Sequence, residues 1–193
     1  TVPKENIDRA IKKSLDKDTV DYDQMRYEGF GPAGTSIIVE ALTDNRNRTA
    51  SNVRSSFQKF GGSLGETGSV SHAFKHYGFL KFNKDVATED EFFNFSIENG
   101  AEDCFVEEDE YEAVCLPDTL SKFYDLLAAK YGEPVSSGFQ WRPDVLVKVD
   151  GDKLKSLINL INELESDEDV QQIFSNFEAS DEELSRIAWL INF

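Results

Sequence analysis

The segment 35–42, TSIIVEAL, constrains the fold most strongly, because a β-branched and apolar run of this length predicts a β-strand. Residues 21–28 predict a second strand, and the connection GFGPAG between the two predicts a hairpin. Asn45 can then cap a helix that runs through about Phe60, where two glycines end it. This order of strand, strand and helix predicts one compact α/β unit.

The rest of the chain alternates between strand and helix patterns. The expected strands cover residues 69–74, 78–82, 103–107, 111–116, 134–141, 145–149 and 170–174, and the expected helices cover residues 88–100, 117–131 and 152–165. In chain order, the last three segments are the strand at 145–149, the helix at 152–165 and the strand at 170–174. They predict a βαβ unit that could return to the first lobe. We therefore predict an α+β fold of two α/β lobes, with a ferredoxin-like lobe at 83–143 inserted into a first lobe at 19–82 and 144–193.

The first residues predict a short helix over 3–13. Pro3 lies near its start, Lys12 and Lys13 lie at its end, and Ile7 and Ile11 are four residues apart. Such a helix is too short to be stable alone. Residues 1–18 are therefore expected to be the final helix of a helical domain cut off upstream, which also fits a start at Thr rather than Met.

Charge is unevenly distributed along the chain. The net charge is −17, yet residues 1–60 hold 10 Lys and Arg against 9 Asp and Glu, so nearly all the excess acid lies after residue 60. Duplex nucleic acid is bound mainly through Lys and Arg that neutralise phosphates. A near-neutral first third can still face a polyanion, while the acidic remainder would be solvated or repelled. That the acidity serves only solubility stays open.

The most distinctive basic segment is LTDNRNRT, residues 42–49, at the expected helix start. If Asn45 or Asn47 caps the helix, Arg46 and Arg48 project from its first turn, where backbone N–H groups and the helix dipole favour anions. The alternative is that these arginines pair with Asp44 and nearby Glu. The predicted nucleic-acid or ribosome contacts are Arg46, Arg48, Arg54, Lys59, Lys12 and Lys13.

Two motifs with chemical associations do not fit their usual context. Gly29, Gly31 and Gly34 satisfy G-x-G-x-x-G, but a strand follows them, whereas a dinucleotide fingerprint opens a helix inside a βαβ unit. His72 and His76 are four residues apart in a segment with a strand pattern, where they would lie about 13 Å apart. That separation is too large for one metal ion.

Other catalytic signals are weak. Acidic runs such as 107–110 and 167–169 are typical of solvated surface, and Cys104 and Cys115 predict small buried hydrophobic side chains. No nucleophile elbow is present, and two histidines leave few ways to build a triad. We therefore predict a non-enzymatic protein with no catalytic residue, metal or cofactor. No membrane helix or signal peptide is recognisable, so we expect a cytoplasmic location.

Several long strings carry a family resemblance. They are PKENIDRAIKK at 3–13, RYEGFGPAG at 26–34, IIVEALTDNRNRTASNVRSSFQKFGGSLGETGSV at 37–70, ENGAED at 98–103 and LESDEDVQQIFSNFE at 164–178. In this order they resemble the YebC family of bacterial regulators and its mitochondrial translational-activator relatives. The resemblance implies a basic helical N-terminal domain followed by two α/β lobes, the last domain interrupting the second. Ala33 departs from the family, which usually has Gly there.

The resemblance implies a regulator of gene expression. The family's traditional role is that of a probable transcriptional regulator that binds DNA, and the alternative is a ribosome-associated translation factor. An enzyme with a metal site between the lobes is a more remote alternative. The implied partners are DNA or the ribosome and its RNA, with no membrane and no small-molecule substrate, in the cytoplasm or, for a eukaryotic protein, the mitochondrion. The sequence does not specify the oligomeric state.

Overall fold

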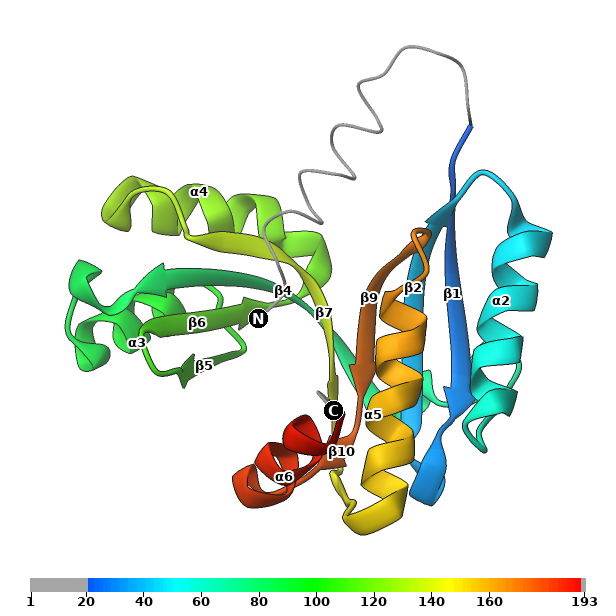
Figure 1. Cartoon of the computed structure of the whole chain (residues 1–193). Helices are drawn as coiled ribbons and strands as arrows, with labels where there is room; N and C mark the ends of the chain where they lie inside the picture. Colours follow the sequence, from blue (N-terminus) through cyan, green and yellow to red (C-terminus); the bar gives the residue numbers. More distant parts are fainter. Residues whose placement is uncertain (1–20, 192–193) are drawn as a thin grey trace. The chain divides into compact units, whose positions relative to one another are not determined.

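The computed structural model describes residues 21–191 of the chain, and the side chains of residues 189–191 are outside this description. The helix expected over residues 3–13, with Lys12 and Lys13, therefore lies outside the described residues. The chain combines helices with mainly antiparallel sheets, which confirms the predicted α+β class. The described residues form two compact units, and each is described by itself: unit 1 holds residues 21–74 and 143–191, and unit 2 holds residues 75–142 (Figure 1).

The sheet of unit 1 has the strand order β3-β1-β2-β9. Strands β1 (Asp23–Phe30) and β2 (Ser36–Thr43) form the predicted hairpin, in which Tyr27 lies opposite Val39. Strand β9 (Val170–Ser175) runs antiparallel to β2, and the short β3 (Ser63–Leu64) pairs with β1. A segment from the end of the chain therefore completes a sheet begun near its start.

The 3₁₀ turn η1 (Pro32–Gly34) joins β1 to β2 and contains a left-handed residue. Ala33 has a φ of 62°, a conformation that costs a residue with a Cβ atom about 1–2 kcal/mol. Glycine, which has no Cβ atom, would adopt this conformation without that cost.

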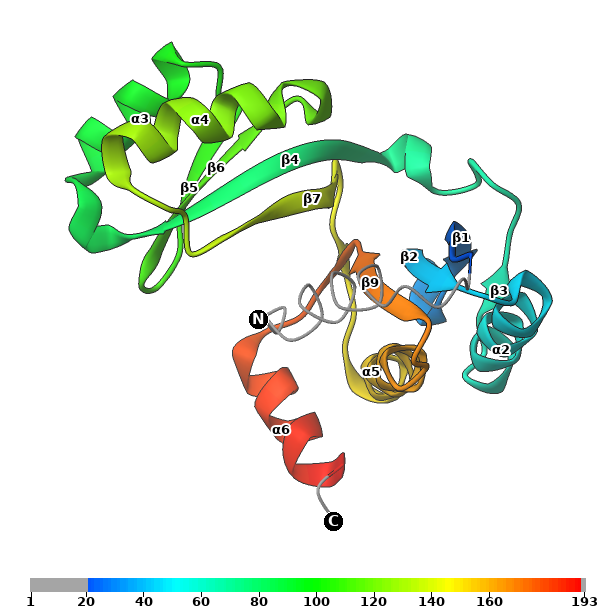
Figure 2. The ribbon, with the colours of Figure 1, turned by 90° about the horizontal axis from the view of Figure 1, so that it is seen from above.

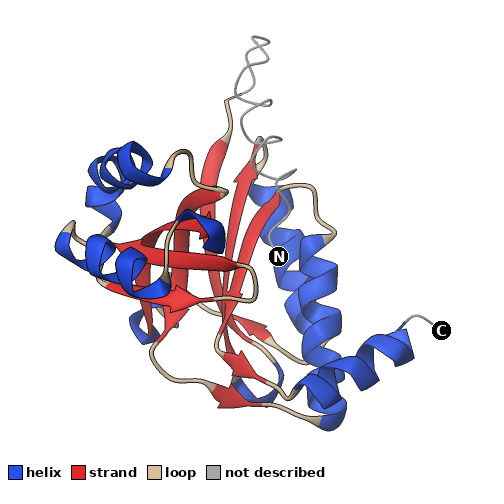
Figure 3. Cartoon of the chain, turned by 90° about the vertical axis from the view of Figure 1, so that its left-hand side faces the viewer, coloured by secondary structure: helices blue, strands red, loops and turns tan. Residues whose placement is uncertain are grey.

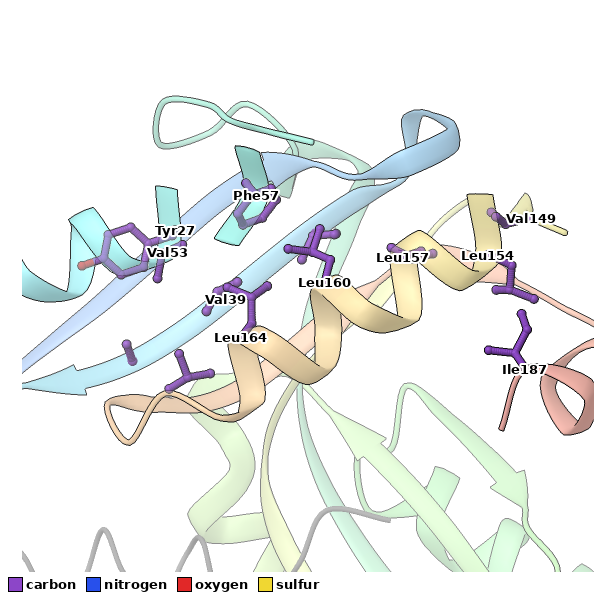
Figure 4. Close-up of a cluster of buried hydrophobic side chains, with 13 residues drawn as sticks. Tyr27, Val39, Val53, Phe57, Val149, Leu154, Leu157, Leu160, Leu164 and Ile187 are labelled. Carbon is purple, nitrogen blue, oxygen red and sulfur yellow. The ribbon is translucent and has the colours of Figure 1, made fainter. Parts of the chain in front are cut away.

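Helices α2 (Arg46–Lys59) and α5 (Gly151–Glu165) cover one face of the unit 1 sheet, as the view from above shows (Figure 2). Helix α5 runs along the strands (Figure 3). Its leucines recur every three or four residues, so one face of the helix is apolar. The core joins sheet, α2 and α5 (Figure 4), through Tyr27, Ile37, Val39, Ala41, Val53, Phe57, Leu154, Leu157, Leu160 and Leu164.

The C-terminal helix α6 (Asp181–Ile191) also packs on unit 1. Its Ile187 is 2% exposed and points toward Leu154 of α5 (Figure 4). Full burial of such a side chain contributes about 1.5–3 kcal/mol. Helix α6 therefore contributes to the unit 1 core through Ile187.

The predicted βαβ unit is wrong. Strand β8 (Val147–Lys148) pairs in parallel with β10 (Phe177–Glu178) in a separate two-stranded sheet, whereas β9 joins the main sheet beside β2. The pattern of strand, helix and strand was correct, but the strands that flank α5 lie in different sheets.

Unit 2 has the element order β4 (Phe74–Asn83), α3 (Glu89–Glu98), β5 (Asp103–Val106), β6 (Glu110–Cys115), α4 (Leu120–Tyr131) and β7 (Ser136–Pro143), with 3₁₀ turns η3 (Lys84–Val86) and η4 (Pro117–Thr119). This βαββαβ order, with strands arranged β5-β6-β4-β7, is that of ferredoxin-like domains. Helices α3 and α4 cover one face of the sheet (Figure 2). The core between them contains Leu80, Phe82, Phe92, Tyr111, Ala113, Phe123 and Leu127.

The sequence placed the junction between the two units at residues 82–83, whereas unit 2 begins at Lys75 in the structure. Strand β4 is one long strand that pairs with β6 from Gly78 to Asn83, so these residues belong to the unit 2 sheet. The strand expected at 69–74 is wrong, because residues 71–73 form the 3₁₀ turn η2 (Ser71–Ala73).

The buried carboxylate of Glu28 holds that turn. It accepts backbone N–H bonds from Val70 at 2.9 Å and from Ser71 at 2.8 Å. Burial disfavours its charge, but the hydrogen bonds from Val70, Ser71 and Gly68 keep the pKa of Glu28 below its usual range. The turn is therefore fixed by a side chain that lies 42 residues before Val70 in the sequence, rather than by local strand pairing.

Candidate functional site

The first turn of α2 is fixed by local hydrogen bonds. The side chain of Asn45 accepts the backbone N–H of Arg48 at 3.1 Å, which identifies Asn45 as the helix cap. The hydroxyl of Thr43 accepts the N–H of Asn45 at 2.9 Å. The basic segment therefore starts from a rigid end of strand β2.

Arg48 is bound by two carboxylates. Its guanidinium lies 2.8 Å from Asp44, four residues before it, and 2.8 Å from Asp169, at the start of β9. The Asp169 side chain is only 8% exposed, whereas that of Arg48 is 47% exposed. The segments LTDNRNRT and LESDEDV, distant in sequence, thus meet at this ion pair.

Asp169 is the centre of a hydrogen-bond network. Besides Arg48, it accepts the hydroxyl of Thr49 at 2.8 Å and that of Thr43 at 3.2 Å. Burial opposes its ionisation, but the donors Arg48, Thr49 and Thr43 outweigh burial and hold the pKa of Asp169 below its usual range. Asp169 is therefore a charged structural link between α2, β2 and β9.

The other predicted cations have different surroundings. Arg46 binds Asp23 of β1 through two bonds of 2.7 and 2.8 Å, which lower the pKa of that carboxyl. Lys59 lies 2.9 Å from Glu163 of α5. Arg54 is exposed and makes no ion pair within residues 21–191. Arg46, Arg48 and Lys59 are thus occupied by acids, and their contact with nucleic acid stays a prediction.

A pocket of about 680 Å³ lies beside this network within unit 1. Arg48 and Asn52 line it, together with the acids Asp44, Glu163, Asp167, Glu168 and Asp169. Negative groups predominate, so the pocket favours cationic over anionic groups. The start of α2 therefore faces an acidic environment that its own sequence does not show.

Buried Tyr27 of β1 lies in the same electrostatic field. Its hydroxyl has no hydrogen-bond partner among the described residues. Burial raises its pKa, and the nearby charges of Asp169 and Asp167 raise it further. The phenol is therefore held neutral, and its ring serves as part of the core.

The glycine motif serves packing. A Cβ atom on Gly29 would lie 2.6 Å from the Phe57 ring, and one on Gly31 would lie 2.7 Å from the Thr35 hydroxyl. The motif leads from β1 through η1 into β2, with no helix after it to bind a phosphate. The motif therefore lacks the strand-turn-helix context of a dinucleotide fingerprint.

The two histidines lie in different elements. His72 is in the 3₁₀ turn η2 and only His76 is in strand β4, so the expected strand geometry was wrong for His72. Among the described residues, no three or more His, Cys, Asp or Glu side chains are grouped to hold a metal ion. Nor is any described helix long and apolar enough to cross a membrane.

Sequence reasoning missed an aromatic group in unit 2. His76 of β4 stacks on Trp141 of β7, with ring centroids 4.4 Å apart and an interplanar angle of 18°. The ring of Phe139 lies 5.8 Å from His76 and is 46% exposed. Phe139 and Trp141 are two residues apart in a strand and so share a face, a spacing that could have indicated this group.

The comparison with known families covers most of both units. A family model described as the TACO1/YebC second and third domain matches residues 22–177. The chain belongs to the TACO1/YebC family. Among solved structures, a conserved hypothetical protein from Aquifex aeolicus is similar to this TACO1/YebC chain, with a TM-score of 0.78 and 35% identity. The match covers 93% of this chain and 74% of the Aquifex chain.

Proposed function

We propose that this TACO1/YebC chain is a non-enzymatic regulator of gene expression that acts on the ribosome. The observation that supports ribosomal action over duplex DNA binding is the pairing of Arg46, Arg48 and Lys59 with carboxylates. Duplex binding depends on cations that neutralise phosphates and release counterions. Cations already neutralised within the protein contribute little to that gain.

A ribosome offers surfaces that suit an acidic protein better. Its RNA includes unpaired bases that proteins recognise by stacking and by base-edge hydrogen bonds, without many phosphate contacts. The acidic pocket beside Arg48 is compatible with cationic protein segments and repels a bare phosphate backbone. The expected location is the cytoplasm, or the mitochondrion of a eukaryote.

DNA-binding transcriptional regulation remains the second candidate. Arg54 favours it, because this residue lies on α2, is exposed and has no ion pair among the described residues. A phosphate could also be shared by Arg46 and Arg48 at the helix start, where the dipole attracts anions. This mechanism requires the arginines to exchange their carboxylates for phosphates.

Co-sedimentation with ribosomes, alongside titration of duplex DNA at a stated salt concentration, tests the proposal. Ribosome association with weak, non-specific DNA binding supports it. Tight and sequence-selective DNA binding without ribosome association would establish the transcriptional alternative instead. Binding to neither would refute both.

The non-enzymatic part of the proposal is tested separately. A metal-dependent enzyme would be stabilised by Mg²⁺ or Mn²⁺ at concentrations that fill its site, because a ligand that binds only the folded state raises the melting temperature. We expect no shift in the melting temperature. A saturable shift would support a metal site and contradict this part of the proposal.

A further inference from the structure

Strand β4 extends beyond its pairing with β6, and this extension carries the aromatic group of His76, Phe139 and Trp141. The last residue of β6, Cys115, lies opposite Gly78, so the part of β4 before Gly78 continues beside β7 without β6. A Cβ atom on Gly78 would lie 3.0 Å from Leu120, at the start of α4. Helix α4 therefore begins to cover strand β4 at Gly78. His76 lies in the part of β4 that precedes Gly78.

The segments that carry these rings contain basic but no acidic residues. Residues 67–84 contain Lys75, Lys81 and Lys84 but no Asp or Glu, and residues 134–143 contain Arg142 but no acid. Both stretches are thus free of acid in a chain of net charge −17. Because β4 and β7 are neighbours, the fold places the two stretches side by side. The strands themselves therefore add no negative charge that would repel a polyanion.

We propose that the aromatic group of His76, Phe139 and Trp141 is a stacking site for the unpaired bases of single-stranded nucleic acid. This inference rests on the proposed function and specifies the chemistry of its partner. The exposed ring of Phe139 provides the outer stacking surface, and the His76–Trp141 stack supports it. Aromatic rings that stack bases are the usual means of binding single strands with little sequence preference.

Stacking, rather than ionic contact, dominates at this site. Arg142 is occupied by an ion pair with Glu112 and lies over the Phe105 ring, and strand alternation places it on the face opposite Trp141. Lys81 pairs with Glu107 at 2.7 Å. With these cations engaged, few counterions are released on binding, so affinity depends only weakly on salt.

Fluorescence of Trp141 provides a direct test. The chain has two tryptophans, so Trp189→Phe leaves Trp141 as the sole reporter in every variant used. Unstructured RNA and DNA oligonucleotides of equal length are titrated into this parent, with a DNA duplex for comparison. We expect single strands to quench Trp141 saturably, with a shallow salt dependence, and the duplex to compete poorly. The RNA and DNA arms show which sugar the site prefers.

The decisive variant is Phe139→Ala, which removes an exposed ring and leaves the core of unit 2 intact. Loss of one stacking contact lowers affinity by about 5- to 150-fold, which corresponds to roughly 1–3 kcal/mol. Ile97→Ala on helix α3 is the matched control, because Ile97 is 52% exposed and lies outside both strands. It should bind like the parent, and thermal melts check the fold of each variant.

Absence of quenching by either oligonucleotide, or equal affinity in Phe139→Ala and the control, overturns the stacking site. Ribosome co-sedimentation of the same preparations separates the two proposals. If the parent still binds ribosomes, the proposed function stands and only the stacking site fails. If single strands quench Trp141 but ribosomes are not bound, the stacking site stands and the ribosomal proposal fails.

Discussion

The start of helix α2 and the β4–β7 strand pair differ in how well the residues of each segment predict which groups are available for binding. The α2 start has the densest arginines in the chain, but Asp23, Asp44 and Asp169 neutralise two of them. The β4–β7 pair has few charges, yet Phe139 is 46% exposed beside a stacked ring pair. The charges that a segment carries therefore indicate its binding capacity only after its spatial neighbours are known.

The largest loss of stability is expected for Asp169→Ala, which tests whether the Asp169 network links the start of α2 to β2 and β9. The change leaves Arg48, Thr43 and Thr49 without their common acceptor. Loss of a buried charged acceptor costs about 2–4 kcal/mol of unfolding free energy. Chemical denaturation measures it, with Asp44→Ala as control because that exposed residue binds the same arginine. Equal losses of unfolding free energy in the two variants would contradict a structural role specific to Asp169.

A smaller effect is expected for Glu28→Gln, which tests whether unit 1 carboxylates act as anchors for the backbone. A neutral amide oxygen accepts these two N–H groups more weakly than a carboxylate does, and the ion pair with Arg26 is lost, so about 1–2 kcal/mol of stability should be lost at neutral pH. The folded pKa of Glu28 is lowered, so its stabilisation is complete above the unfolded pKa of about 4.3 and disappears as pH falls through the lower folded value.

Denaturation at a series of pH values measures this effect. The wild-type chain should lose stability below about pH 4 more steeply than Glu28→Gln, because the variant has no proton to take up there. Parallel pH profiles would show that the Glu28 carboxylate is not an anchor. Glu66→Gln, a change in a nearby exposed carboxylate, controls for the charge alone.

The smallest effect is expected for the double variant Arg46→Ala and Arg54→Ala. Arg46 lies in an exposed ion pair with Asp23, and such pairs contribute little to stability. Ribosome association should stay close to that of the wild type, as measured by co-sedimentation over a range of salt. A large loss of affinity with a flatter salt dependence would show that these arginines contact phosphates. The start of α2, rather than the β4–β7 pair, would then be the better candidate for the nucleic-acid contact.

Locally determined features were predictable from the sequence. Asn45 caps α2 through a bond to a residue three positions later, and Thr88 caps α3 through a capping box with Glu91. The β1–β2 hairpin depends on a short connection that includes Pro32 and Gly34. Each of these signals lies within a few residues, so neither sheet order nor distant partners affect it.

Features set by distant contacts were not predictable. Arg48 meets Asp169 across 121 residues, whereas the sequence alone suggested Asp44 and nearby Glu as its partners. The pairing of β8 with β10 similarly depends on which sheet each strand joins. The aromatic group was missed because His76 and Trp141 come from strands separated by most of unit 2. A single sequence does not show which distant residues come into contact.

The division of unit 1 into two segments has a consequence for synthesis. Unit 2 is continuous from residue 75 to 142, so its whole sheet is available to fold as soon as that stretch leaves the ribosome. Strand β2 must wait for β9, whose residues 170–175 emerge much later, and until then its edge is unpaired. The nascent chain therefore completes its inserted unit first, and protection of the β2 edge is among the last steps of its folding.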